Sequence, residues 1–482
     1  MVLSANMQRN LCFYTNLDQF QGVALVAESV SISYAELEAR VVEQAAILGS
    51  ESWQNDHDVC LAALEFERSI DAVVNYLAAL RTQTPLLLLD HELPLSVRHH
   101  LFSKLGVSLV LSGQSVMQVA PRPFVNMQTQ KSSTLHYPAL LMSTSGSSGN
   151  PKSVMLSREN LLANTLSILD YLPIRQNDCG ITTLPLTYSF GLSVLNTHLA
   201  MGATMVLTDE PLMSKTFWQQ VKDHKVTSLS GVPFHYQMLR RLRIERMHLD
   251  SIKYLAQAGG RLAPEQVSHF ASLCAERDWQ FFVMYGQTEA TARMGYVPSE
   301  VLESAPDVIG QAIPGGRFEI HDLDTNEVIT DIGKQGELWY FGDNVMLGYA
   351  EQPSDWLGGR LPHKALATGD LAQWTEAGWV RITGRLSRFI KIQGKRYQLD
   401  HVEQQLHALG AEVVCCGRDD RLYLVCREVH DVLIEQLTRY ARETLNLHPS
   451  LWALVEITDI PSLSSGKIDY QALITLCEQR GS

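Results

Sequence analysis

The segment Tyr137–Lys152 combines residue types that can bind a polyanion. An apolar run, Ala139–Met142, reads as a short buried strand, and residues 143–149 are all serine, threonine or glycine. Glycines let the backbone turn its N–H groups toward one point, hydroxyls add donors, and Lys152 adds a compact positive charge. This composition suits the phosphates of a nucleotide, although a Ser/Gly-rich loop taken alone is also typical of a flexible connection.

The spacing of Gly146, Lys152 and Ser153 invites comparison with the Walker A pattern G-x-x-x-x-G-K-[ST], which holds phosphates with backbone N–H groups and a lysine. Pro151 stands where that pattern has its second glycine. Because proline has no N–H and a fixed φ, the usual anion cradle cannot form. The sequence therefore disfavours a P-loop ATPase or kinase, which would release ADP.

A second candidate motif, Tyr285–Glu289, follows the apolar run Phe281–Met284. Its tyrosine offers an aromatic face for a base, Thr288 a hydroxyl for a phosphate, and Glu289 a hard oxygen ligand for Mg²⁺. Each residue alone is usually structural. These residue types are compatible with a nucleotide site, and a family resemblance of the chain is what implies one.

Ser143–Lys152 resembles the phosphate loop of the adenylate-forming superfamily. Four more motifs follow it in the family's order, and the resemblance spans residues 137 to 469. That superfamily comprises acyl- and aryl-CoA synthetases, the adenylation domains of nonribosomal peptide synthetases, and luciferases. The resemblance implies that ATP and Mg²⁺ are used to activate a carboxylic acid. Residues 1–136 match only in general style.

The resemblance also implies roles for individual residues. Lys467, Thr288 and Glu289 would be catalytic, and Glu289 would bind the metal. The ATP or AMP would be bound by Thr144, Ser145, Gly146, Ser147, Ser148, Gly149, Lys152, Gly259, Gly260, Tyr285, Gly286, Thr288, Asp370 and Arg385. Gly259 and Gly260 would let the adenine lie close to the backbone, and Asp370 would accept hydrogen bonds from the ribose hydroxyls.

The acid would be bound in a pocket lined by Tyr188, Phe190, Gly231, Pro233 and Phe234. Family members commonly have histidine where this chain has Tyr188, and amino-acid-activating members carry an aspartate that pairs with the substrate's amine. No aspartate is near Tyr188 in the sequence, and a buried ammonium without a counter-charge is costly. A non-amino aryl or fatty acid is therefore expected, and both aromatic residues are equally compatible with an ordinary core.

Two positions near the C-terminal region carry further implications. Ser387 stands at the family's hinge, where Asp or Lys is usual, and Gly394 stands where a glycine lines the tunnel for a pantetheine thiol. The C-terminal domain would rotate about the hinge after adenylation and withdraw Lys467. The acceptor would be coenzyme A or the phosphopantetheine of a separate carrier protein.

Strand and helix patterns alternate through most of the chain, which argues for parallel α/β layers. Ser33 and Ser157 are each placed to cap a helix. The chain is expected to enter the helix capped by Ser157 at Val154, and this helix to extend to about Tyr171. The resemblance implies a large N-terminal domain of α/β layers, residues 1–385, with a small β-barrel subdomain at about 311–385. A small mobile α+β domain, 386–482, would follow.

Composition limits the remaining classes. The 482 residues carry 39 basic and 52 acidic side chains, a net charge of −13, so nucleic acid is an unexpected partner. No apolar run is long enough to cross a membrane, and no secretory signal is recognised. The chain has eight cysteines, at positions 12, 60, 179, 274, 415, 416, 426 and 477, and we expect them to be buried thiols of a cytoplasmic protein. The neighbours Cys415 and Cys416 are expected to lie on a strand and not to form a redox pair.

The sequence thus predicts an acid–thiol ligase that forms AMP and pyrophosphate. Within the family, a stand-alone amino-acid-activating enzyme and a luciferase-like oxidation stay open, and an unrelated ATPase or kinase is the rival from another class. The acid, the acceptor and the oligomeric state are not readable from the residues.

Overall fold

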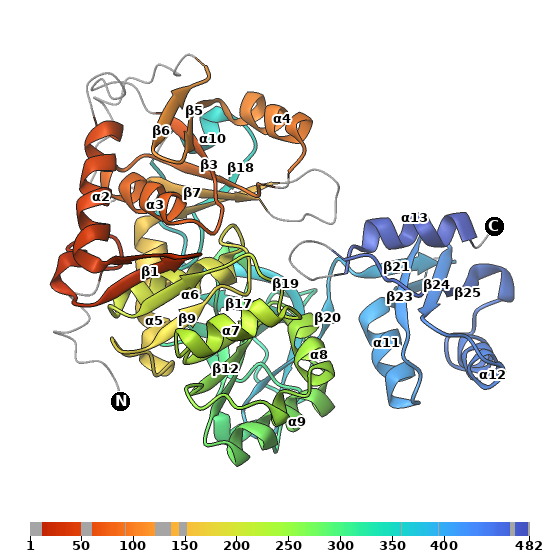
Figure 1. Cartoon of the computed structure of the whole chain (residues 1–482). Coiled ribbons are helices and arrows are strands. Elements are labelled where there is room, and N and C mark those ends of the chain that lie inside the picture. Colours follow the sequence, from red (N-terminus) through yellow and green to blue (C-terminus); the bar gives the residue numbers. More distant parts are fainter. Residues whose placement is uncertain are drawn as a thin grey trace. The chain divides into compact units, whose positions relative to one another are not determined.

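The computed structural model describes residues 12–49, 60–91, 93–120, 136–143, 152–357, 359–393, 395–462 and 468–480. The chain divides into two compact units, Met1–Arg317 with Tyr340–Leu366, and Phe318–Trp339 with Ala367–Ser482 (Figure 1). Strands and helices alternate, which confirms the predicted α/β class. The predicted domain boundary after Arg385 and the subdomain at about 311–385 stay predictions.

The first unit contains a sheet that is nine-stranded within the described residues. Its central strands are parallel, and its two edges are antiparallel. The strand order is β15 (Gln311–Ala312), β14 (Gly295–Val297), β13 (Gln280–Tyr285), β12 (Tyr254–Gln257), β11 (Ser228–Gly231), β9 (Cys179–Ile181), β10 (Thr204–Leu207), β1 (Val23–Ala27) and β2 (Val30–Ser33).

A second sheet of this unit has seven strands in the part of the chain that is described. Strands β7, β4, β3 and β5 are parallel, and antiparallel strands extend both sides. The order is β18 (Gly348–Ala350), β8 (Ser153–Ser157), β7 (Pro138–Ser143), β4 (Leu86–Leu89), β3 (Leu61–Glu65), β5 (Val107–Ser112) and β6 (Ser115–Gln118).

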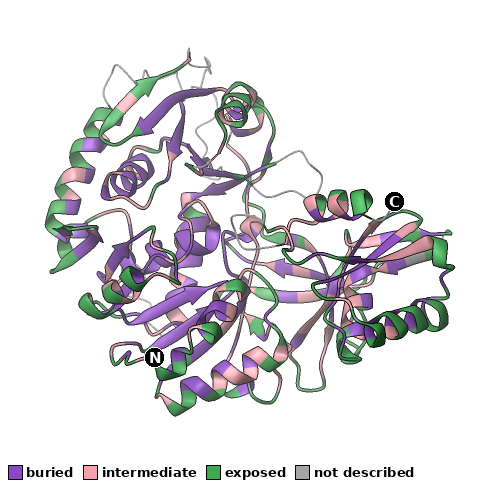
Figure 2. Cartoon of the chain, turned by 45° about the vertical axis from the view of Figure 1, so that its right-hand side comes forward, coloured by how far each residue is buried: buried purple, intermediate pink, exposed green. Residues whose placement is uncertain are grey.

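Helices and short turns connect these strands. The helices of the first unit are α2 (Tyr34–Leu48), α3 (Ile70–Thr82), α4 (Leu95–Leu105), α5 (Arg158–Tyr171), α6 (Ser189–Ala200), α7 (Lys215–Asp223), α8 (Pro233–Arg241), α9 (Pro264–Glu276) and α10 (Pro353–Trp356). The 3₁₀ turns are η1 (Leu17–Gln19), η3 (Ile244–Arg246), η4 (Thr288–Ala290) and η5 (Ser299–Val301). Figure 2 shows that the central strands are buried while the outer faces of several helices are exposed.

The leucine run of β4 explains how the seven-stranded sheet is covered. Leu86 and Leu88 belong to the large core that also takes in residues of the nine-stranded sheet. Leu87 and Leu89 point to the other face, where they join a smaller core with α4 and with Trp356 of α10. A strand buried on both faces has no polar alternation, so consecutive leucines are what such a strand requires.

Most of the second unit consists of three small sheets and flanking helices (Figure 1). The strands of these sheets are β16 (Arg317–His321), β17 (Gly336–Phe341), β19 (Ala365–Trp374), β20 (Val380–Arg385), β21 (Phe389–Ile392), β22 (Lys395–Gln398), β23 (Val414–Arg418), β24 (Arg421–Cys426) and β25 (Trp452–Glu456). The helical elements of the unit are α11 (Leu399–Ala408), α12 (Asp431–Arg439), the π-helical η6 (Tyr440–Thr444), η7 (Pro449–Leu451) and α13 (Tyr470–Arg480). Helices α11 and α13 pack against β23.

The two predicted helix caps are confirmed. The Ser33 hydroxyl accepts from the Glu36 N–H while the Glu36 carboxylate accepts from the Ser33 N–H, which starts α2. Ser157 and Asn160 exchange the same pair of bonds at the start of α5. The expectation that Val154 enters this helix is wrong, because Ser153–Ser157 is strand β8, paired with β7. Short apolar runs do not distinguish strand from helix, and here pairing decided.

The cysteines are free thiols, and all except the half-buried Cys12 are buried. Cys416 lies on β23 as predicted, and its Sγ is 3.7 Å from the Sγ of Cys477 on α13. A thiol of this strand therefore contacts a thiol of α13. No described helix is long and apolar enough to span a bilayer.

His198 of α6 is a buried titratable residue that should make the fold sensitive to acid. Burial lowers the pKa of His198 from 6.5 to about 4, and its Nδ1 lies 2.8 Å from the Val194 carbonyl oxygen, to which a neutral ring donates. As the pH falls from 6.5 toward 4, the unfolded chain binds a proton that the folded chain does not. The free energy of unfolding therefore falls as the pH is lowered, and at pH 5.0 it is about 2 kcal/mol smaller than at neutral pH.

The change His198→Asn tests this, since asparagine keeps an N–H donor but does not titrate. We expect the urea midpoint to fall less between pH 7.5 and pH 5.0 in the variant than in the wild type. An equal fall in both proteins would show that His198 does not carry the acid sensitivity.

Candidate active site

Predicted site residues of the first unit lie at one edge of the nine-stranded sheet. Strands β11, β12 and β13 are neighbours and parallel, so their carboxyl ends share an edge. Gly231 ends β11, Gly259 and Gly260 follow β12, and Tyr285 ends β13. In parallel α/β sheets this edge is where ligands bind. The topology therefore brings three separate predicted motifs to one place.

The motif after β13 is held by a tight turn. Gly286 has no room for a side chain, since a Cβ there would lie 1.8 Å from the Ala292 carbonyl oxygen. Thr291 has φ 69° and ψ −57°, and the Ala292 N–H donates to the Ala290 carbonyl at 2.8 Å. This is the rare γ-turn with positive φ, which is strained for a β-branched residue.

Asn344 stabilises this turn from a distant part of the sequence. Its side-chain Nδ2 donates to the backbone carbonyls of Ala290 at 2.8 Å and Arg293 at 3.1 Å. The backbone carbonyl of Asn344 accepts from the Thr291 hydroxyl at 2.8 Å. Tyr340 in turn donates to Asn344 Oδ1 at 2.8 Å. A buried, fully bonded amide fixes the backbone that carries Thr288 and Glu289.

Thr288 and Glu289 lie on η4, each with a polar neighbour. The Thr288 and Ser189 hydroxyl oxygens are 3.3 Å apart, which links η4 to the start of α6. Glu289 Oε1 accepts from the Tyr349 hydroxyl at 3.0 Å. Burial, followed by the charge of Glu289, raises the pKa of Tyr349, so this hydroxyl stays protonated and donates.

Lys152 lies against the same tyrosine. Its Nζ is 5.4 Å from the centre of the Tyr349 ring and 3.8 Å from Glu351 Oε1. Tyr349 lies on β18, which pairs with β8 directly after Lys152. The lysine predicted to bind phosphate and the glutamate predicted to bind Mg²⁺ thus contact the same side chain, one at the ring face and the other at the hydroxyl. Sequence reasoning did not identify Tyr349 or Glu351.

The predicted acid pocket gathers around Tyr188. A Cβ on Gly259, whose φ is +79°, would lie 2.3 Å from the Tyr188 hydroxyl, and a Cβ on Gly260 would lie 3.1 Å from Pro233. Burial raises the pKa of Tyr188 to about 12, so its hydroxyl is neutral. Phe234 at the start of α8 is 51% exposed. Gly259 is therefore required both by the close approach of Tyr188 and by its conformation, whereas Gly260 packs closely against Pro233.

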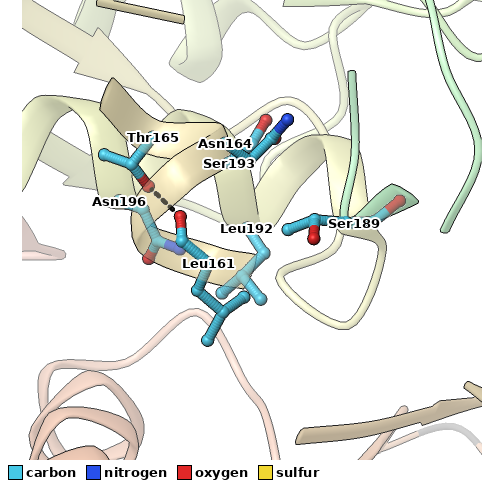
Figure 3. Close-up of a pocket in the computed structure, with 8 residues that line it drawn as sticks. Leu161, Asn164, Thr165, Ser189, Leu192, Ser193 and Asn196 are labelled. Carbon is cyan, nitrogen blue, oxygen red and sulfur yellow. Dashed lines mark hydrogen bonds between the residues drawn. The ribbon is translucent and has the colours of Figure 1, made fainter. Parts of the chain in front are cut away.

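Phe190 belongs to the core beside this pocket. It is 3% exposed, and the guanidinium carbon of the buried Arg293 lies 4.8 Å from its ring centre. Residues of α5 and α6, Ser189 among them, line a small pocket (Figure 3). Its lining residues are Leu161, Asn164, Thr165, Ser189, Leu192, Ser193, Asn196 and Thr291. Six of these eight lining residues carry polar side chains, and none of the eight is a residue predicted to line the acid pocket.

His235 is a residue near the pocket that sequence reasoning missed. Its Nδ1 accepts from the Val232 N–H at 3.2 Å, so the ring proton is on Nε2. Burial and then the charge of Arg68 lower the pKa of His235 to about 4. This histidine is neutral at physiological pH and can donate one hydrogen bond.

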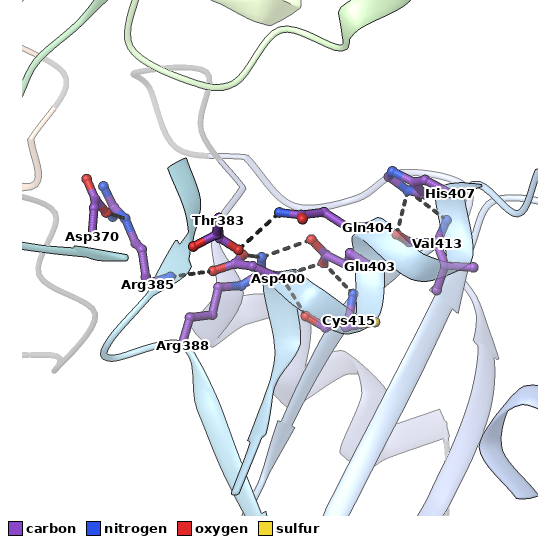
Figure 4. A network of polar contacts seen from close by, with 10 residues as sticks. All are labelled: Asp370, Thr383, Arg385, Arg388, Asp400, Glu403, Gln404, His407, Val413 and Cys415. Carbon is purple, nitrogen blue, oxygen red and sulfur yellow. Dashed lines mark hydrogen bonds and ion pairs between the residues drawn. The ribbon is translucent and has the colours of Figure 1, made fainter. Parts of the chain in front are cut away.

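In the second unit, Asp370 and Arg385 form a pair between neighbouring strands. Asp370 on β19 is opposite Arg385 on β20, and Asp370 Oδ1 accepts from Arg385 Nε at 2.6 Å (Figure 4). The carboxylate side chain is only 3% exposed, whereas the arginine is 54% exposed. The two predicted ATP- or AMP-binding residues of this unit are thus brought together.

The predicted hinge Ser387 is exposed and lies in the turn between β20 and β21. Asp400 bridges this turn, since it accepts from the Arg385 N–H at 2.9 Å and pairs with the guanidinium of Arg388 (Figure 4). Arg388 also pairs with Glu403 and donates to the Cys415 carbonyl at 2.8 Å. Other predicted residues lie outside the described ones: Thr144, Ser145, Gly146, Ser147, Ser148, Gly149, Gly394 and Lys467.

Comparison with known proteins decides the family. Residues 16–350 match the model of the AMP-binding enzyme family. This chain belongs to the AMP-binding enzyme family. The superfamily resemblance predicted from the motifs is therefore confirmed.

The same AMP-binding enzyme is similar over its length to larger proteins and to solved structures of its own size. It is 27% identical over 499 aligned residues to bacitracin synthase 3 of Bacillus licheniformis, covering 93% of this chain and 7% of that protein. The structure matches o-succinylbenzoate CoA synthetase of Bacillus subtilis, solved with the acyl-adenylate OSB-AMP, with TM-score 0.75 and 21% identity over 96% and 98% of the chains. ATP-bound MatB of Rhodopseudomonas palustris gives TM-score 0.73 and 19% identity over 99% of each chain.

These likenesses differ in what they support. The chain spans less than a tenth of the length of the first curated relatives that it matches. The activities and partners of those larger proteins therefore do not carry over directly to this AMP-binding enzyme. The structural likeness supports the fold.

The donor set at Glu289 fits a magnesium ion that is shared with a nucleotide. In the described part of the chain, no three His, Cys, Asp or Glu side chains are grouped so that they could hold a metal by themselves. Mg²⁺ bound through one or two carboxylates and substrate phosphates needs no such group. Glu289 offers one hard oxygen ligand, and Lys152 lies nearby for phosphate.

Proposed function

We propose that this AMP-binding enzyme uses ATP to activate a carboxylic acid as an acyl-adenylate, releasing pyrophosphate, and then transfers the acyl group to a thiol. The observation that carries the proposal is the meeting of Lys152 and Glu289 at Tyr349. A phosphate-binding cation and a metal-binding carboxylate from two distant motifs thereby share one place.

In the first half-reaction the acid carboxylate attacks the α-phosphorus of ATP, and the two anions repel each other. The protein must supply positive charge and alignment. Lys152 and the loop of residues 144–149 would bind the outer phosphates, and the Thr288 hydroxyl would orient the α-phosphate. Glu289 would hold Mg²⁺, which neutralises phosphate charge when bound. Lys467 would contact the carboxylate and the ribose-phosphate oxygen.

The nucleoside would be bound by the residues to which the family resemblance assigns that role. Tyr285 would stack on adenine beside Gly259 and Gly260, and Asp370 would accept from the ribose hydroxyls with Arg385 next to it. After pyrophosphate leaves, rotation about Ser387 would remove Lys467 and admit a thiol past Gly394. Coenzyme A and a separate carrier protein are the two acceptors considered, and the acyl group would be passed from AMP to the sulfur.

A non-amino aryl or fatty acid is the proposed substrate class. The side chains that approach Gly259 and Gly260 are Tyr188, Val232 and Pro233, none of which carries a negative charge. An ammonium placed there would lack a counter-charge. The second candidate is a stand-alone amino-acid-activating enzyme, which the likeness to bacitracin synthase 3 favours.

Pyrophosphate release across a panel of aryl, fatty and amino acids tests the proposal. We expect release of AMP and pyrophosphate that depends on the added acid, with the best acid lacking an α-amine. Formation of ADP, or turnover without any acid, would contradict the proposal. Adding coenzyme A or a carrier protein with phosphopantetheine then separates the two acceptors.

The change Phe234→Ala tests the acid pocket with little risk to the fold, because the ring is 51% exposed. We expect the KM for the acid to rise about 5- to 30-fold, as for the loss of about 1–2 kcal/mol of aromatic contact, while the KM for ATP is unchanged. Met213→Ala is a matched control, since Met213 is also 51% exposed. An unchanged KM for the acid in Phe234→Ala would remove Phe234 from the pocket.

A further inference from the structure

Tyr349 lies on the edge strand β18, beside the end of the phosphate-binding segment. In the antiparallel ladder with β8, Tyr349 is opposite Val154 and Ala350 is opposite Ser153. Lys152, the residue before Ser153, therefore lies just beyond the end of the ladder, beside Glu351. Side chains alternate along a strand, which places Tyr349 and Glu351 on one face. Both of them contact the Lys152 ammonium, at 5.4 Å from the ring centre and 3.8 Å from the carboxylate.

The Tyr349 hydroxyl fixes one oxygen of Glu289. An ionised carboxylate only accepts, so the 3.0 Å contact is a hydrogen bond from tyrosine to Glu289 Oε1. The backbone of Glu289 is held as well, because its carbonyl accepts from the Met346 N–H at 2.9 Å. Among the described residues no hydrogen bond is made to Glu289 Oε2. The second oxygen is therefore the one that is left to bind a cation.

The Tyr349 side chain also contacts two opposite charges at different points. Lys152 lies over the ring face, and Glu289 is bonded at the hydroxyl end of the same ring. The Lys152 side chain is 52% exposed and the Glu351 side chain is 47% exposed, and an exposed ion pair of this kind is weak and readily exchanged. The ion pair with Glu351 is thus weak enough for Lys152 to exchange it for a phosphate.

We propose that Tyr349 is a positioning residue for nucleotide binding: its hydroxyl orients Glu289 toward the Mg²⁺ of bound MgATP, and its ring face supports the Lys152 ammonium that binds the outer phosphates. The inference rests on the proposed function, because it presupposes that the chain binds MgATP. Partners that orient a metal-binding carboxylate commonly change metal affinity by 10- to 100-fold when they are lost.

The test compares Tyr349→Phe with the wild type by calorimetric titration, without any acid present. We expect the Mg²⁺ concentration that gives half-maximal ATP binding to rise about 10-fold or more in the variant. The Kd for AMP should stay within about twofold, since AMP lacks the outer phosphates that Mg²⁺ and Lys152 bind. Mn²⁺ in place of Mg²⁺ allows metal binding in the ATP complex to be read by its EPR signal.

Tyr296→Phe is the matched control. Tyr296 is a half-buried tyrosine of the same unit, its hydroxyl accepts from Gln311 Nε2 at 2.8 Å, and neither residue has a predicted role. Metal dependence and AMP binding should both be unchanged in this variant. A cycle with Glu289→Gln adds a second check, because Tyr349→Phe should have almost no further effect once the carboxylate is gone.

Two results would overturn the inference. Wild-type metal dependence in Tyr349→Phe would show that Glu289 is positioned without the hydroxyl. Equal weakening of AMP and MgATP would show a general disturbance and not a role at the metal. If the wild type itself bound no MgATP, the proposed function would fail first and the inference with it, so the two failures are distinguishable.

Discussion

Lys467→Ala is expected to lower acyl-adenylate formation by about 100- to 1000-fold, roughly 2.7–4 kcal/mol, as for the loss of one preorganised stabiliser. The attacking carboxylate and ATP are both anions, and Lys467 is the cation that the family motif assigns to the carboxylate. Thioester formation from supplied acyl-adenylate should be nearly unaffected. The two half-reactions are measured separately, by pyrophosphate exchange and by thioester yield.

A suitable control is Lys391→Ala, which removes an exposed lysine of the same unit that has no predicted role. Both half-reactions should keep their wild-type rates in this control. Equal loss of both half-reactions in Lys467→Ala would reject the view that the lysine serves only the first of two conformations.

Gly286→Ala is expected to cost about 4 kcal/mol or more of the free energy of unfolding. The new Cβ would lie 1.8 Å from the Ala292 carbonyl oxygen and 2.7 Å from its carbon, and backbone atoms cannot move aside as a side chain can. The turn that carries Thr288 and Glu289 would open. We therefore expect the protein that stays folded at low temperature to lose MgATP binding as well.

The measurement is the urea midpoint, together with ATP titration below the unfolding transition. Gly315→Ala is the control, since Gly315 has φ +83° but nothing within 4 Å of a Cβ. It should cost only the about 1–2 kcal/mol of left-handed strain. Similar losses in both variants would mean that the clash at Gly286 relaxes easily, and that the turn is not the rigid support described above.

Several elements were predictable because their signals are local. Ser33 and Ser157 each precede a helix and have an acceptor or amide three residues later, so capping follows from the sequence alone. The run Phe281–Met284 predicted a buried strand that delivers Tyr285, and β13 ends there. In each case the residues that decide the structure are within one turn or one strand.

Other features could not be predicted because they depend on pairing between distant segments. Val154 looked like the entry to a helix, and only the ladder with β7 makes it part of β8. Tyr349, Asn344 and Ser189 belong to no motif recognised in the sequence. Each is placed at the site by a contact with a residue of η4 or of the turn after it, more than 50 positions away in the chain.

The sequence by itself determined the family and the chemistry available to it: a phosphate loop with Lys152, a base-and-metal motif at Tyr285–Glu289, and the order in which these occur. The tertiary structure alone decided that Lys152 and Glu289 meet at Tyr349, and that Asn344 holds a strained turn. The physical reason is that residue type and local spacing fix which groups a chain carries. Strand order and register fix which of those groups come within a few ångströms of one another.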